Sequence, residues 1–296
     1  MLEGVLNIDK PLGLTSHDVV ARVRRHGRLR RVGHAGTLDP LATGVLVVCL
    51  GRATRLVEYL VGQPKTYETV VRLGETTNTY DAEGEVTAVL PVPTGLTTAV
   101  LEPILDRFRG HIQQIPPMYS AIKKDGQPLY KMARRGESIE IPPRPVTIYD
   151  LTLVAWEPPH LSLRVTCSAG TYIRSLGHDI GQALGCGGHL VQLRRTAVGA
   201  LTTATAVALD DLTPENIASY LQPPDTAVSH LPRLNLSTPE TQDLYQGRHI
   251  AHQTNHPAAE LVRAYDAHGR FAGIVVAHGG QTQWRPHKMF TPIADS

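Results

Sequence analysis

The sequence predicts an α+β protein, because segments typical of strands and of helices follow one another without the strict alternation of a doubly wound parallel sheet. Short apolar or alternating runs predict strands at residues 44–50, 66–74 and 160–170. Apolar residues spaced three and four apart predict helices at residues 16–26, 97–110 and 170–185.

The N-terminal elements follow from local signals. Ser16 is the expected N-cap of the first helix, whose apolar stripe is formed by Val19, Val20 and Val23. The run from Gly44 to Leu50 is uniformly apolar and predicts a buried strand. Residues 66–74 alternate as a second strand, and the polar residues 76–86 after it predict a loop.

The middle of the chain predicts a helix at 97–110, a strand at 160–170 and a helix at 170–185. The helix at 97–110 is expected to end at Gly110, and the helix at 170–185 is expected to end at Gly185. The apolar faces we expect are Val100, Ile104, Leu105 and Phe108 on the first helix, Leu161, Leu163 and Val165 on the strand, and Ile173, Leu176, Ile180 and Leu184 on the last helix.

The chain is long enough for one large domain and one small one. A cluster of prolines and a change of charge at 221–236 predict a boundary, so we expect domains at 1–225 and 230–296. Within the first, residues 112–146 carry six prolines and several Lys, Arg and Tyr residues, which predicts a surface excursion that contacts RNA. In the second, residues 260–280 predict two strands joined by a turn.

Charge is unevenly distributed although the formal net charge is only +2. Residues 1–55 hold nine Lys and Arg against four Asp and Glu, and six of the arginines lie in 22–31. Residues 206–260 reverse this, with seven acids against two arginines. The basic N-terminal part suits a polyanion, although a solvated helix face is an equally good interpretation of an isolated arginine run.

The cysteines and apolar runs exclude several classes of protein. Cys49, Cys167 and Cys186 lie far apart without a C-x-x-C pair, so neither a disulfide framework nor a zinc site is expected. No run of about 18 uncharged apolar residues occurs, and the N-terminus lacks the pattern of a signal peptide. We expect a cytoplasmic protein without a membrane partner or a metal.

One carboxylate, Asp39, stands in the glycine-rich segment GHAGTLDPLATG, residues 33–44. A phosphate-binding loop would need a lysine here, and a dinucleotide fingerprint would need a different glycine spacing. A magnesium-dependent phosphotransferase would typically need a second acid at position 41, where the chain has leucine. Pattern alone therefore favours Asp39 as a turn former before proline.

A resemblance spread over residues 4–200 changes that interpretation. The segment GHAGTLDPLATGVLVVCLGRATR resembles the catalytic motif of the bacterial TruB-type tRNA pseudouridine synthases, whose essential aspartate corresponds to Asp39. Further blocks that agree in order are NIDKPLGLTS, KTYETVVRLGETTNTYDAEG, PPMYSAIKKDGQPLYKMARRG, CSAGTYIRSLGHDIGQALGCGGHL and LVQLRRTAVG.

The resemblance implies a fold and a substrate. The fold is that of pseudouridine synthases, with a mixed, mostly antiparallel central sheet, followed by a small C-terminal PUA-like β barrel that binds RNA. The substrate implied is the T-loop uridine of tRNA at position 55, which is isomerised without a cofactor by a monomeric enzyme. The base must leave its stack, which costs a few kcal/mol and needs a pocket that replaces the lost stacking.

The resemblance also assigns catalytic roles to residues. Arg174 corresponds to the arginine that pairs with the catalytic carboxylate, and Tyr67 to the tyrosine that stacks on the flipped uracil. A guanidinium beside Asp39 would favour the ionised acid and fix its orientation. From the residue pattern alone, Tyr67 is more often a packing residue of an alternating strand.

Further positions would contact the substrate. Tyr172 and Leu193 would line the pocket, and His34 would enter the RNA loop that the base leaves. Lys10 matches a motif near the floor of the site, although the adjacent proline makes a structural turn an equally good interpretation. The pair Arg194 and Arg195 could contact phosphates or form a solvated edge.

Two functions of other classes remain in view. A non-catalytic RNA-binding or RNA-folding protein could keep this scaffold, and a hydrolase could use Asp39 on a nucleoside or glycoside. The hydrolase would normally need a second carboxylate, and these motifs offer no acid for that role. For the isomerase, Asp39 could add to C6 of uracil, attack C1′ of the ribose or assist elimination to a glycal.

Overall fold

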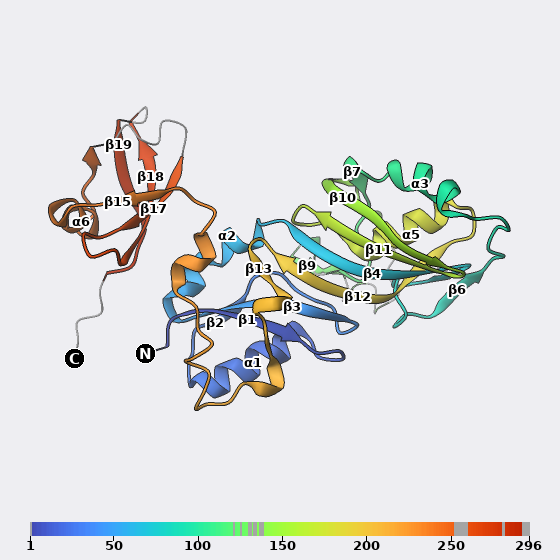
Figure 1. The fold of residues 1–296 in the computed structure, drawn as a ribbon, viewed down its shortest axis with the longest axis horizontal. Coiled ribbons are helices and arrows are strands. Elements are labelled where there is room, and N and C mark those ends of the chain that lie inside the picture. The colour runs from blue at the N-terminus through green and yellow to red at the C-terminus, as the bar shows by residue number, and fades with distance from the viewer. Residues whose placement is uncertain are drawn as a thin grey trace.

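The computed structural model describes residues 2–120, 122–124, 126–129, 132, 135, 139–251, 260–279 and 282–291. Its main sheet follows the strand order β14-β1-β3-β12-β4-β11-β10-β7, with β2 paired to β3 and β13 paired to β12 (Figure 1). The bounds are β1 Gly4–Lys10, β2 Val32–His34, β3 Ala42–Leu50, β4 Lys65–Leu73, β7 Gly110–Gln114, β10 Arg144–Glu157, β11 His160–Cys167, β12 Gly188–Val198, β13 Leu201–Thr202 and β14 Val207–Ala208.

Shorter strand pairs and the helices complete the first part of the chain. The pairs are β5 Glu75–Thr77 with β6 Val86–Val89, and β8 Lys123–Lys124 with β9 Gln127–Pro128. The helices are α1 Ser16–Gly27, α2 Val57–Val61, α3 Thr98–Asp106 and α5 Ile173–Ala183, with short 3-10 segments η1 Gly51–Leu56, η2 Thr203–Thr205, η3 Leu209–Asp211 and η4 Pro224–Val228.

The main sheet is mixed and mostly antiparallel, as expected. Parallel pairing occurs between β1 and β14 and between β3 and β12. The second of these pairs is important for the site, because it sets Arg195 of β12 opposite Gly44 of β3. The loop that carries Asp39 leads directly into β3, so the pairing of β3 with β12 fixes the C-terminal end of that loop.

Strand β3 is buried on both faces, which explains its unbroken apolar sequence. Leu46 and Val48 belong to a core cluster that also contains Val19 and Val23 of α1. Val45 and Val47 belong to a second cluster on the other face. The prediction of a buried strand over Gly44–Leu50 is confirmed, with the observed strand beginning two residues earlier.

Three local predictions need correction. The N-cap of α1 is Thr15, whose hydroxyl accepts from the Asp18 N–H in a capping box, and Ser16 is the first helical residue. Helix α3 ends at Asp106, because Gly110 begins β7 instead; Val100 is 46% exposed, while Leu101 and Leu105 are buried. The predicted loop 76–86 extends from β5 into β6, which pair in antiparallel fashion.

The strand predicted at 160–170 and the helix predicted at 170–185 are confirmed. Leu161, Leu163 and Val165 are buried along β11, and the expected apolar face of α5 is buried from Ile173 to Leu184. The expected excursion at 112–146 lies partly outside the described residues, which omit 121, 125, 130–131, 133–134 and 136–138.

A second, smaller sheet in the order β15-β17-β18-β19-β16 forms the C-terminal part and lies beside α2 (Figure 1). Strands β17 and β18 are antiparallel, as expected for residues 260–280. Arg55 donates to the Met289 carbonyl oxygen at 2.8 Å and Arg52 to that of Thr291 at 2.6 Å, so the two parts are in direct contact. The bounds are β15 Arg233–Asn235, α6 Thr238–Tyr245, β16 Ile250–Ala251, β17 Leu261–Tyr265, β18 Phe271–His278 and β19 Gln283–Met289.

The curled second sheet fits the small β domain that we expected, and the domain limits 1–225 and 230–296 stay predictions. The last pairing of the linker with the main sheet is the bridge between Val5 and Gln222. Among the described residues, no helix is long and apolar enough to span a membrane.

Candidate active site

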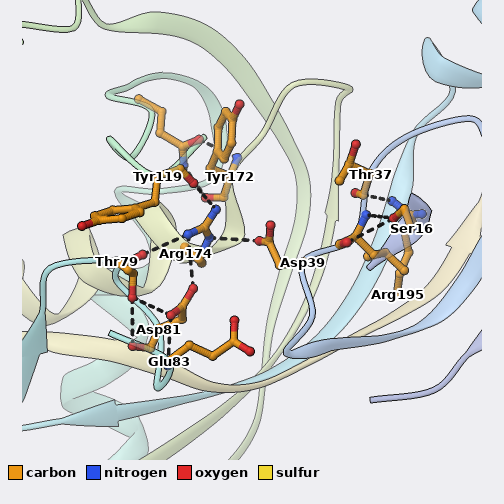
Figure 2. Close-up of polar contacts among 12 residues, drawn as sticks. Ser16, Thr37, Asp39, Thr79, Asp81, Glu83, Tyr119, Tyr172, Arg174 and Arg195 are labelled. Atoms are coloured by element: carbon orange, nitrogen blue, oxygen red, sulfur yellow. Dashed lines mark hydrogen bonds and ion pairs between the residues drawn. The ribbon is translucent and has the colours of Figure 1, made fainter. Parts of the chain in front are cut away.

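Asp39 lies in the loop between β2 and β3, and the side chain of Ser16 fixes the main chain directly before it. The Ser16 hydroxyl accepts from the Leu38 N–H at 2.8 Å and donates to the Leu38 carbonyl oxygen at 3.1 Å (Figure 2). Ser16 is buried, so water does not compete for these bonds. The residue that we expected to cap a helix therefore anchors the loop that carries the candidate carboxylate.

Arg195 holds the same loop from the other side. Its side chain is 1% exposed, and it donates to the carbonyl oxygens of Val45 at 2.7 Å and Gly36 at 3.0 Å. Neither earlier interpretation, a phosphate contact or a solvated edge, applies to Arg195. Its partner in the pair, Arg194, is half-exposed and bridges Asp9 at 2.6 Å.

Gly44 explains why the motif ends in glycine. Its φ is +96°, and a Cβ on this residue would lie 2.2 Å from the carbonyl oxygen of Arg195. Any other residue would therefore be strained in its backbone and would also push β12 away from β3. The glycine allows the two strands to approach at the point where the Asp39 loop is anchored.

Asp39 and Arg174 form an ion pair, with Arg174 Nε 3.1 Å from Asp39 Oδ2 (Figure 2). Arg174 is in the first turn of α5 and its side chain is 7% exposed, whereas that of Asp39 is 39% exposed. The guanidinium also donates from Nη2 to the Tyr119 carbonyl oxygen at 2.8 Å and from Nη1 to that of Thr79 at 3.1 Å. The arginine is therefore held rigidly, while one side of the carboxylate stays open to solvent.

A second carboxylate, Asp81, shares the same arginine, and the sequence analysis did not identify it. Asp81 Oδ2 lies 3.2 Å from Arg174 Nη1, and its side chain is 4% exposed. The Thr79 hydroxyl donates to Asp81 Oδ1 at 2.5 Å. The block KTYETVVRLGETTNTYDAEG contains this aspartate, so its presence in a matched block was the available signal.

The charges around Asp39 act in opposite directions. Burial among protein groups raises the pKa of the Asp39 carboxyl above its ordinary value, and the nearby Asp81 charge raises it further. The guanidinium of Arg174 lowers the same pKa, and the ammonium of Lys10 adds to that effect. Burial has the largest effect, so the Asp39 carboxylate is more basic than that of an exposed aspartate, which favours nucleophilic or proton-transfer chemistry.

The two predicted tyrosines lie on elements that flank this ion pair. Tyr67 is buried on β4, opposite Arg195 in the strand register, and burial raises the pKa of its phenol. Tyr172 directly precedes α5, and its main chain is held by Gln114, which accepts from the Tyr172 N–H at 2.7 Å and donates to its carbonyl oxygen at 3.0 Å. Both phenols are close enough for the Asp39 charge to raise their pKa values.

For Lys10 the sequence left two interpretations open, a residue near the floor of the site and a structural turn, and the structure has features of both. It is fully buried, and its ammonium donates to the carbonyl oxygens of Pro11 at 2.9 Å and Leu14 at 2.6 Å, so it stabilises the turn. Burial lowers the pKa of Lys10 to about 8, and the Asp39 charge opposes this shift. The ammonium therefore also contributes positive potential to the site.

His34 and Leu193 lie at the edges of the site. The His34 ring packs edge-on against that of His17, with centroids 5.7 Å apart, and burial lowers the pKa of His34. Leu193 pairs with Ala42 of β3 and lines a groove of about 620 Å³ that also includes Leu41. Arg194 also lines this groove, whereas Asp39, Tyr67 and Arg174 do not.

The described part of the chain holds no group of three or more His, Cys, Asp or Glu side chains arranged to bind a metal ion. The three cysteines are free and buried, and burial raises the pKa of the Cys49 thiol to about 12.

Residues 24–173 match the family described as TruB family pseudouridylate synthase (N terminal domain). The chain belongs to the TruB family. Residues 174–229 match the tRNA pseudouridylate synthase B C-terminal domain, and residues 232–281 match the family described as Pseudouridine synthase II TruB, C-terminal.

The similarity to curated relatives extends over nearly the whole of this chain. The tRNA pseudouridine synthase B of Ralstonia pickettii is 46% identical over 94% of this chain and 92% of its own, and that of Pseudomonas aeruginosa is 46% identical over 92% and 91%. Among solved structures, a Cbf5-Nop10-Gar1 complex aligns with a TM-score of 0.75 and 28% identity, covering 98% of this chain and 85% of that one. An H/ACA RNP bound to a substrate RNA containing 2′-deoxyuridine aligns with a TM-score of 0.73 and 26% identity, with the same coverage.

Proposed function

We propose that this TruB-family protein converts uridine to pseudouridine in tRNA, and that its target is the T-loop uridine at position 55. The observation that carries the proposal is the Asp39–Arg174 ion pair, in which a rigid guanidinium orients one half-exposed carboxylate. The relatives at 46% identity are named as tRNA pseudouridine synthases, and their similarity extends over both parts of the chain.

The proposed reaction is an isomerisation without redox change. The bond between N1 of uracil and C1′ of ribose breaks, the base turns, and a bond forms between C5 and C1′. Addition of Asp39 to C6, its attack on C1′ and its assistance of glycal formation each require the ionised carboxylate. Arg174 supports that state, because its positive charge lowers the pKa of Asp39.

The other predicted residues receive roles in exposing and holding the base. Tyr67 stacks on the flipped uracil, while Tyr172 and Leu193 line the space around it. His34 enters the RNA loop that the base has left, and Lys10 attracts the polyanion from the floor of the site. These contacts compensate for the stacking lost on flipping, which costs a few kcal/mol.

Recognition of the tRNA body is proposed to involve the basic end of α1 and the C-terminal PUA-like sheet. Arg25, Arg28, Arg30 and Arg31 are exposed, whereas Arg22 is paired with Asp210. Exposed arginines close together in the sequence favour phosphate contacts, which position an RNA without reading its sequence. We propose that the enzyme acts on tRNA as a monomer.

The test is to incubate the protein with an unmodified tRNA transcript and to map pseudouridine while measuring free uracil. The proposal predicts one pseudouridine at position 55, no release of uracil, and no product when the transcript carries cytidine at that position. Release of free uracil would indicate a hydrolase instead, and tRNA binding without any product would indicate a non-catalytic RNA-binding protein.

A further inference from the structure

The proposed isomerisation requires an acceptor for the proton on C5 of uracil. When C5 bonds to C1′, the hydrogen on C5 must leave as a proton, and N1 must gain one. This holds whichever way Asp39 acts, because the product always carries its sugar on C5 and a hydrogen on N1. An inference about that acceptor therefore rests on the proposed function.

Most ionisable groups near Asp39 are already engaged. Asp81 is bound to Arg174 and Thr79, and its side chain is nearly inaccessible. Lys10 is buried and donates to two carbonyl oxygens, so its nitrogen serves as a donor. Burial raises the pKa of the Tyr67 phenol, and a neutral phenol is a very weak proton acceptor.

Glu83 differs from all of these groups. Its side chain is exposed, and it forms no hydrogen bond or ion pair with any residue that the structure describes. Figure 2 shows the Glu83 carboxylate pointing away from Asp81 and toward the side of Arg174 on which Asp39 lies. It is close enough to Asp39 for that charge to raise the pKa of Glu83, after the larger effects of burial and of Asp81.

The position of Glu83 is fixed by the turn that carries it. Its N–H donates to Asp81 Oδ1 at 3.1 Å, so the turn is tied to the same aspartate that holds Arg174. The next residue must be small, because a Cβ on Gly84 would lie 2.2 Å from the Thr79 hydroxyl oxygen. The main chain at Glu83 is therefore rigid, while its carboxylate is free to accept a proton.

We propose that Glu83 is the catalytic residue that takes the proton from C5 of the target uracil. Once the C5–C1′ bond has formed, the carboxylate removes the C5 proton and the C–H electron pair becomes the C5=C6 double bond. The electron pair displaced from C6 returns to N1, or to the Asp39 carboxylate where that oxygen has added to C6. N1 is then protonated by the Glu83 carboxylic acid, directly or through a water molecule. No oxidant, reductant or net proton is consumed.

The position of this carboxylate beside Asp81 and Asp39 also suits the task. The surrounding protein groups partly desolvate the Glu83 carboxylate and so raise its pKa, and the neighbouring charges of Asp81 and Asp39 raise it further, which makes it a stronger base than a free glutamate. Bound RNA would exclude further water and strengthen this effect. Asp39 would then act while the bond between N1 and C1′ breaks, and Glu83 would act afterwards on the proton at C5.

The test compares Glu83→Gln with a matched control, Glu85→Gln, in single-turnover conversion of tRNA carrying either hydrogen or deuterium at C5 of uridine. Glu85 lies on the same turn and is exposed, and its N–H donates to Asn78 Oδ1 and not to Asp81. We expect Glu83→Gln to slow conversion about 10²- to 10⁴-fold, the usual contribution of a general base. The tRNA Kd should stay within about twofold, and the C5 isotope effect should exceed that of wild type. Glu83→Asp should recover part of the rate, and Glu85→Gln should match wild type.

Conversion by Glu83→Gln at the wild-type rate would overturn the proposal. So would a defect confined to tRNA Kd without a larger isotope effect, since that would mark Glu83 as a binding residue. Absence of pseudouridine with the wild-type protein would instead contradict the proposed function itself, so the two failures are distinguishable.

Discussion

The substitution Arg174→Lys tests whether the planar guanidinium, and not merely its charge, organises the site. Arg174 donates from three nitrogens to Asp39, Asp81 and two carbonyl oxygens. A lysine ammonium is a single point donor, and it can keep the buried Asp81 paired but cannot also reach Asp39 and Tyr119. The variant therefore loses the bond that orients Asp39 while it keeps a positive charge beside Asp81.

The magnitude follows from that lost bond. A hydrogen bond to a charged group contributes about 1.5 to 3 kcal/mol, which corresponds to about a 10- to 150-fold slower reaction if the bond acts in the transition state. Stability should also fall, because the bond to the Tyr119 carbonyl oxygen is lost as well. Arg174→Met, by contrast, would leave Asp81 buried without a partner and should cost about 3 to 5 kcal/mol in stability.

The assay is single-turnover pseudouridine formation at saturating tRNA, with stability measured by urea unfolding. Arg164→Lys is the control, because Arg164 is exposed and its ion pair with Glu68 is long, at 3.5 Å. Exposed pairs contribute roughly 0 to 1 kcal/mol, so this control should keep both its rate and its stability. An Arg174→Lys rate within about twofold of wild type would refute the orienting role of the guanidinium.

Three further predictions concern pH and stability. Asp81→Asn removes a negative charge that raises the pKa of Asp39, so the acid limb of the pH–rate profile should move to lower pH; an unchanged or higher limb would contradict the charge coupling. Gly44→Ala, with its Cβ 2.2 Å from a β12 carbonyl oxygen and φ at +96°, should lower the unfolding free energy by about 3 kcal/mol or more. Gly33→Ala has open space and should change it by less than about 0.5 kcal/mol; equal effects would show that the close strand approach is unimportant. Burial lowers the pKa of Lys65 from 10.5 to about 8, so the unfolded chain binds more protons between these values, and wild type should gain stability with rising pH relative to Lys65→Met. If the unfolding free energies of wild type and Lys65→Met changed with pH in the same way between about pH 8 and 10.5, Lys65 would not be desolvated.

The parts of the fold that local patterns control were predictable. The alternation of Leu161, Leu163 and Val165 and the apolar face of α5 are buried as expected, because each element places one side on the core. On α3, Leu105 is buried as expected, but Val100 is exposed and its neighbour Leu101 is buried instead. Periodicity marks an element more reliably than it marks the orientation of a short one.

The site was predictable only through the resemblance, because its contacts join distant segments. Asp81 meets Arg174 across 93 positions, and Arg195 reaches Gly36 across 159, so no local pattern could reveal either contact. Ser16 and Thr15 are both good helix caps, and the tertiary contact of Ser16 with Leu38 distinguishes them. The sequence analysis did not identify Asp81 and Glu83 as neighbours of Asp39 for the same reason, since both come from a segment predicted only as a polar loop.

The central claim is that Asp39 is the catalytic carboxylate of a tRNA pseudouridine synthase, and Asp39→Asn tests it most directly. The two side chains have nearly the same shape, and an amide oxygen can still accept from Arg174, so the fold and tRNA binding should be retained. In single-turnover mapping on an unmodified tRNA transcript, wild type should convert one T-loop uridine, and Asp39→Asn should bind the transcript with similar Kd and form no pseudouridine. Full conversion by Asp39→Asn would contradict the account.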